Sequence, residues 1–114
     1  MAFFRTYTTP DGESHFGEID FGLDVQSGGL QSPIQPVSGL VYRRLPADYF
    51  NDWHPAGRRQ WVIPLVNEVE MQVSDGEVRR LKPGDMCLVE DTSGRGHITR
   101  CLGQEHTTLF VRLS

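Results

Sequence analysis

Apolar and polar residues alternate over short runs along this chain, and no segment shows the 3.6-residue repeat of an amphipathic helix. Gly, Pro, Asn and Asp, which are typical of turns, separate the runs. Connections too short for crossover helices favour antiparallel pairing. The pattern therefore predicts an all-β sandwich or barrel. The predicted strands are residues 3–8, 15–21, 39–45, 58–66, 68–73, 78–81, 86–90, 97–102 and 107–113.

Turn residues add detail to this pattern. The segments SDGE at 74–77 and KPGD at 82–85 predict tight turns, because Gly accepts a positive φ and Pro fixes φ. Residues 23–36 are rich in Gly, Ser, Gln and Pro, which predicts a surface loop. Pro64 lies inside the clearest strand and lacks a backbone donor, so we expect it at a sheet edge or a bulge.

The length of 114 residues fits one domain, with a core at 38–114 and N-terminal strands and a loop at 1–37. Alternation along the best strands predicts a set of buried apolar side chains. These are Trp61, Ile63, Leu65, Val69, Met71, Val73, Leu88, Leu109 and Val111.

Composition and charge narrow the class of protein. The formal net charge is −4 and the basic residues are scattered, which argues against nucleic-acid binding. No apolar run approaches the length of a membrane span, and the first residues lack the apolar stretch of a signal peptide. We therefore expect a soluble cytoplasmic protein. Cys87 and Cys101 form no CxxC pair and are interpreted as buried thiols in a reducing compartment.

Two segments carry a resemblance to a known family. LKPGDMCLVEDTSGRGH at 81–97 is similar to the second sequence motif of the cupins, and WHPAGRRQWVIPLVNEVEMQV at 53–73 is similar to a degenerate form of their first motif. Cupins are double-stranded β-helix barrels, also called jelly rolls. The resemblance covers about half of the chain and implies this barrel fold. It also implies a homodimer, since cupins often dimerise.

Metal-binding cupins hold a divalent ion with three histidines and one Glu or Gln. The resemblance implies that His54, Gln60 and His97 are the ligands here, for Fe, Mn, Ni, Cu or Zn. Ala56 stands where the second histidine is expected, so the usual set is one ligand short. Either water or a substrate oxygen fills that position, or the site no longer binds a metal.

Strand alternation extends the candidate site. If Gln60 faces the barrel interior, Arg58 faces it too, and its fork of donors could hold a carbonyl or carboxylate of the substrate. Arg58 could equally pair with a carboxylate at the rim. His97 is the candidate for proton transfer, because imidazole exchanges protons near neutral pH.

The remaining candidates lie near these residues in the sequence. Glu90 precedes the loop before His97 and could act as a general base or orient the imidazole. Asp91 could contact substrate, or it could cap the loop through backbone N–H groups. Trp53 could line the mouth of a substrate cavity.

Three functions remain open at this point. The first is an isomerase, lyase or dehydratase that acts on a small oxygenated organic molecule in the barrel cavity. The second is a cupin that binds or senses a ligand without chemistry. The third is a relic whose metal site has decayed, as Ala56 suggests. An active or binding site should bring the polar residues together around a cavity, whereas a decayed one should scatter them.

Overall fold

The computed structural model describes all 114 residues, which form β-strands and no helix. The strands are β1 (Phe3–Thr8), β2 (Ser14–Glu18), β3 (Asp24–Gln26), β4 (Gly29–Gln31), β5 (Val37–Leu45), β6 (Phe50–His54), β7 (Gln60–Val66), β8 (Val69–Val73), β9 (Val78–Leu81), β10 (Met86–Val89), β11 (His97–Cys101) and β12 (His106–Leu113). The all-β prediction is confirmed. No helix of the chain is long and apolar enough to cross a membrane.

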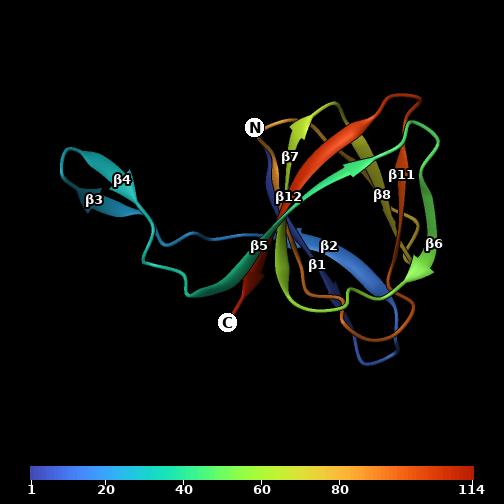
Figure 1. Ribbon diagram of the computed structural model, residues 1–114. Helices are drawn as coiled ribbons and strands as arrows, with labels where there is room; N and C mark the ends of the chain where they lie inside the picture. The colour runs from blue at the N-terminus through green and yellow to red at the C-terminus, as the bar shows by residue number, and fades with distance from the viewer.

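The strands form three sheets, none of which closes into a barrel. A six-stranded sheet has the order β2-β1-β10-β7-β12-β5, and a four-stranded sheet has the order β6-β11-β8-β9. Strands β3 and β4 form a separate hairpin that projects away from both sheets (Figure 1). All strand pairs are antiparallel except β1 and β10, which run parallel.

Strand register sets the two faces of the six-stranded sheet. Cross-strand partners form one row on the face toward the second sheet and another row on the outer face. The inner row is Phe4, Cys87, Val62, Phe110 and Val41. The outer row is Arg5, Leu88, Trp61, Val111 and Leu40.

The two larger sheets pack face to face through a small apolar core. Phe4 and Cys87 of the six-stranded sheet join Met71, Val73 and Leu81 of the four-stranded sheet in this cluster. Each of these side chains is almost fully excluded from solvent. The core occupies the β1–β10 side of the interface and leaves the β5–β12 side to a cavity.

The predicted buried set is correct in part. Trp61, Val69, Met71, Val73 and Leu88 are buried. Ile63, Leu109 and Val111 are only half-buried, and Leu65 is exposed, so their predicted burial is wrong. The reason is that these four lie on the outer face of the six-stranded sheet, which no second layer covers. Trp61 is buried there because Phe21 stacks on its ring at 5.6 Å.

Most predicted strands agree with the structure to within about two residues. Both predicted turns are present, with Gly76 at φ 98° and Gly84 at φ 92°. The sequence pattern missed β6, whose short run lacks clear alternation. The prediction of a loop over 23–36 is also wrong in part, because β3 and β4 form within it, held by main-chain pairing rather than by burial.

Pro64 lies in β7, between β10 and β12, so it is not at a sheet edge. The β7–β12 register shifts between Thr107 and Thr108, whose partners are Val66 and Pro64. This irregularity is the alternative that the missing donor predicted.

Two leucines test the assignment of core and surface. Leu81 is fully buried in the core, whereas Leu65 retains 43% of its surface. Leu81→Ala should lower the free energy of unfolding by about 2–5 kcal/mol, because it leaves a cavity. Leu65→Ala should lower it by less than about 1 kcal/mol. Urea titration measures both, and similar losses for the two variants would contradict the packing described here.

Candidate functional site

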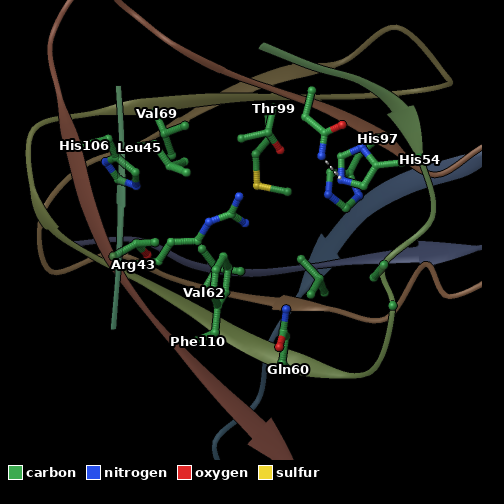
Figure 2. Close-up of a pocket in the computed structure, with 16 residues that line it drawn as sticks. Arg43, Leu45, His54, Gln60, Val62, Val69, His97, Thr99, His106 and Phe110 are labelled. Carbon is green, nitrogen blue, oxygen red and sulfur yellow. Dashed lines mark hydrogen bonds between the residues drawn. The ribbon is translucent and has the colours of Figure 1, made fainter. Parts of the chain in front are cut away.

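A cavity of about 230 Å³ opens between the two large sheets (Figure 2). Apolar side chains such as Val62, Val69 and Phe110 form part of its wall. Its polar lining comes from strands β5, β6, β7, β11 and β12. The polar lining residues are Arg43, Asn51, His54, Gln60, His97, Thr99, His106 and Thr108.

His97 is held in place by the carboxylate of Asp91, which has no exposed surface. The His97 ring nitrogen Nδ1 donates to Asp91 Oδ2 over 2.6 Å. The other oxygen, Asp91 Oδ1, accepts from the Thr6 hydroxyl over 2.7 Å. No hydrogen bond involves Nε2 of His97, which belongs to a residue that lines the cavity. A carboxylate on Nδ1 fixes the tautomer and stabilises an imidazolium, so Nε2 is arranged to accept a proton.

His54 lies beside His97, with 4.5 Å between the ring centroids. Its Nδ1 donates to the backbone oxygen of Asp52 over 2.7 Å, and its Nε2 accepts from the Asn51 amide over 3.2 Å. Burial lowers the pKa of His54, and the nearby His97 adds to this effect. His54 is therefore a neutral imidazole with both nitrogens engaged, and it suits binding rather than proton transfer.

Gly96 allows the two histidines to approach. Its backbone has a φ of 72°, and a Cβ built on it would lie 1.9 Å from the backbone oxygen of His54. The Gly96 oxygen accepts from the buried Ser14 hydroxyl over 2.6 Å. Only glycine fits between these groups. This contact places the start of β11 against the end of β6, where His97 and His54 are cross-strand partners.

Three of the sequence-predicted site residues line the cavity together: His54, Gln60 and His97. Asp91 lies behind His97 and reaches the cavity only through it. Trp53 does not line the cavity, and its ring lies under the Arg95 guanidinium, at 4.8 Å.

Glu90 and Arg58 lie outside the cavity. The Glu90 carboxylate accepts from Arg59 Nε over 2.7 Å and lies 3.7 Å from Arg5. Arg5 belongs to the outer row of the six-stranded sheet, so the Glu90 carboxylate lies on the outer side, away from His97. The carboxylate that accepts from His97 is Asp91. Arg58 is exposed and does not line the cavity, because it precedes β7 and the alternation of that strand does not extend to it.

Sequence reasoning missed Arg43 and His106, which both line the cavity. Arg43 lies in β5 between Val41 and Leu45, and a charged residue at an inward position of an apolar strand is a signal that could have identified it. His106 begins β12, and its Nδ1 donates to the backbone oxygen of Asn67 over 3.1 Å. Burial lowers the pKa of His106, so it is also a neutral imidazole.

The residues present are a poor set of ligands for the divalent ion that the resemblance implies. No group of three His, Cys, Asp or Glu side chains is placed to hold a metal ion. His54 Nε2 already accepts from Asn51, and Ala56 supplies no donor atom. Two histidines and the Gln60 amide fall below the three strong ligands that usually hold an ion. These residues do not support the metal site that the resemblance implies. Elemental analysis of the purified protein tests whether a metal is bound.

Comparisons with known proteins bear on the fold alone. No protein-family model matches this chain, and no curated protein matches it in sequence. Among solved structures, the crystal structure of protein NMB1881 from Neisseria meningitidis is similar, with a TM-score of 0.53 and 19% sequence identity. The match covers 66% of this chain and 72% of that chain. At this identity the likeness shows a shared all-β arrangement and carries no activity.

Substituting two glycines separates the site contact from backbone strain. Gly96 and Gly103 both have positive φ, but a Cβ at Gly103 would meet no atom within 4 Å. Gly103→Ala should cost about 1 kcal/mol of stability, from backbone strain alone. Gly96→Ala should cost more than about 3 kcal/mol, because it adds the overlap with His54. Denaturant titration compares the two variants, and equal losses would show that the close approach at His54 is absent.

Proposed function

We propose that this chain is a small cupin-fold protein that binds a small oxygenated organic molecule between its two sheets and transfers a proton on it. The jelly-roll assignment is supported by the motif resemblance and by the all-β likeness to the Neisseria protein. The catalytic part is supported chiefly by the Asp91–His97 pair, because its free Nε2 belongs to a residue that lines the cavity. A histidine base of this kind supports an isomerase or a lyase as the reaction class.

The chemistry follows from the groups present. His97 Nε2 takes a proton from a carbon next to a carbonyl, and the C–H electron pair moves to form an enolate. Asp91 stabilises the imidazolium that results, and Thr6 keeps the carboxylate in position. In isomerisation the imidazolium returns the proton to another carbon of the delocalised enolate. In elimination the enolate pair forms a C=C bond, the C–O bond to a hydroxyl on the neighbouring carbon breaks, and the imidazolium proton leaves with that oxygen as water. Asp91 acts through His97, so it is a positioning residue.

A ligand-binding protein without chemistry is the alternative. The same cavity and the same hydrogen-bonding side chains would serve it, and Ala56, at the position where the motif has a second histidine, is the feature that favours it. The small volume of the cavity supports a ligand of few carbon atoms in either case, because drug-sized ligands occupy cavities of about 300–1,000 Å³.

Proton exchange tests the catalytic proposal without knowledge of the reaction. Small ketones, keto acids and hydroxy acids are incubated with the protein in D₂O, and loss of C–H signal is followed by NMR. His97→Gln should lower the exchange rate by about 10²–10⁴-fold. Asp91→Asn should lower it too and shift its pH profile, since the imidazolium loses its counter-charge.

His15 supplies the control for this experiment. It pairs with Asp75 over 2.9 Å and does not line the cavity, so His15→Gln should leave exchange unchanged. Exchange that survives His97→Gln at full rate would contradict the catalytic role. Binding without exchange for every compound would favour the ligand-binding alternative.

We also propose a homodimer through the outer face of the six-stranded sheet. Leu40 and Tyr42 are more than half exposed on that face. On the β3–β4 hairpin, Val25 and Leu30 are cross-strand partners with 68% and 69% of their surface exposed. An isolated two-stranded hairpin is marginally stable, so a second surface against this apolar pair would stabilise it. In a two-fold dimer each hairpin would reach the outer face of the other copy.

Charge supports the same arrangement. Residues 19–42 contain Asp20 and Asp24 and no Lys or Arg. Arg44 lies two residues after Tyr42 on the outer face of β5, where Tyr42 and Glu105 interact with it but no carboxylate forms an ion pair with it. The β3–β4 hairpin carries Asp24 and no basic residue, so this carboxylate and Arg44 would be a favourable pair across an interface.

Light scattering after gel filtration tests the dimer. The full chain should show twice the mass of one chain, and Leu40→Glu should reduce it to the mass of one, because it places a charge in the apolar contact. Val78→Glu is the control, since Val78 is similarly exposed but lies in β9, at the edge of the other large sheet. A single-chain mass for the unaltered protein would overturn the proposal.

A further inference from the structure

The cavity contains one permanent charge and no counter-charge. Sixteen residues line it, and Arg43 is the only Lys, Arg, Asp or Glu among them. The Arg43 side chain forms no ion pair and no hydrogen bond within the chain. Its guanidinium carbon lies 5.6 Å from the centre of the Tyr49 ring. Figure 2 shows its side chain reaching toward the middle of the cavity, between His106 at one end and the His54–His97 pair at the other.

No neighbouring group neutralises this arginine. The Asp91 carboxylate is fully buried and already accepts from Thr6 and His97. His54 and His106 carry no negative charge in either protonation state. Water can solvate Arg43 through the mouth of the cavity, because its side chain is exposed. It therefore stays charged without a partner until an anion enters.

The next residue in β5, Arg44, is an arginine that lies outside the cavity. Arg44 follows Arg43 in β5, and strand alternation directs it to the outer face with Tyr42. Both residues are arginines of the same strand, but only Arg43 lines the cavity. The difference is one of placement, which makes Arg44 a matched control.

We infer that the ligand of this cavity is a small monocarboxylate whose carboxylate binds the Arg43 guanidinium. A guanidinium presents two parallel N–H donors that match the two oxygens of a carboxylate. One arginine balances one negative charge, whereas a phosphate dianion would leave charge uncompensated among the apolar side chains of the wall. A small monocarboxylate is thus the substrate class of this cavity, which rests on the proposed function for the cavity being the ligand site.

This placement also orients the molecule. With its carboxylate at Arg43, a ligand of a few carbons extends toward the histidine pair, where Nε2 of His97 is the free base. The carbon chain passes Val62 and Met71, which line the cavity. The ligand that fits is thus an acid with a second oxygen-bearing carbon at the His97 end, such as a keto acid or a hydroxy acid.

Calorimetric titration of the purified full chain tests the inference. The probes are 2-oxo and 3-hydroxy acids of three to five carbons, the amide of each acid, and inorganic phosphate. Each acid that binds should bind at least about tenfold more tightly than its amide. Arg43→Met should weaken acid binding at least about tenfold, Arg43→Lys should weaken it less, and Arg44→Met should leave it unchanged.

The outcomes separate this inference from the proposed function. Acid binding that persists in Arg43→Met, amides that bind as well as acids, or phosphate as the only ligand would each overturn it. Circular dichroism checks that each variant is folded. If Arg43→Met does not fold, Arg43→Lys provides the comparison, because it keeps the charge and loses the paired N–H donors of the guanidinium. His97→Gln should keep acid binding while losing proton exchange. If the unaltered protein binds acids through Arg43 but exchanges no protons, only the catalytic proposal is rejected.

Discussion

The buried carboxylate of Asp91 is the interaction on which the rest of the site depends. Its two oxygens accept from Thr6 in β1 and His97 in β11, and its backbone oxygen accepts from the N–H of Ala56, two residues after His54. A carboxylate without exposed surface is tolerated only when its oxygens are hydrogen-bonded. The two side-chain bonds join β1 of one sheet to β11 of the other and hold the His97 ring, so the buried carboxylate sets both the contact between the sheets and the geometry of the candidate site.

Much of the fold could be predicted because local rules specify it. Alternation located most strands, and turn chemistry located the bends at Gly76 and Gly84. The buried face of β8 was predicted correctly, whereas those of β7 and β12 were not, because alternation gives two faces and does not say which one meets a second layer. Leu65 and Leu109 share a good apolar pattern and still lie on the outer face. Only the partner sheet decides between the faces, and it forms from distant sequence.

The candidate site shows the same division. His54, Gln60 and His97 were predicted from motif resemblance, and the structure brings them to one cavity. The partner of His97 was harder to predict, since Glu90 and Asp91 are adjacent and both follow the end of β10 at Val89. One residue of offset sends Glu90 to Arg59 on the outside and Asp91 to the interior. Arg43 matched no motif, and its place in the cavity could be recognised only once β5 was known to line it.

The order of strands has a consequence for how the chain folds. Thr6 and Asp91 are 85 positions apart, and β1 pairs with β10 across a similar separation. Strand β12 lies between β5 and β7, so the sheet that forms one wall of the cavity is continuous only after that strand is inserted. Contacts of such long range require closure of large loops before any of them gains free energy. Refolding should therefore be slow compared with that of helical domains of this size, and the cavity wall should be complete only once β12 has paired with both β5 and β7.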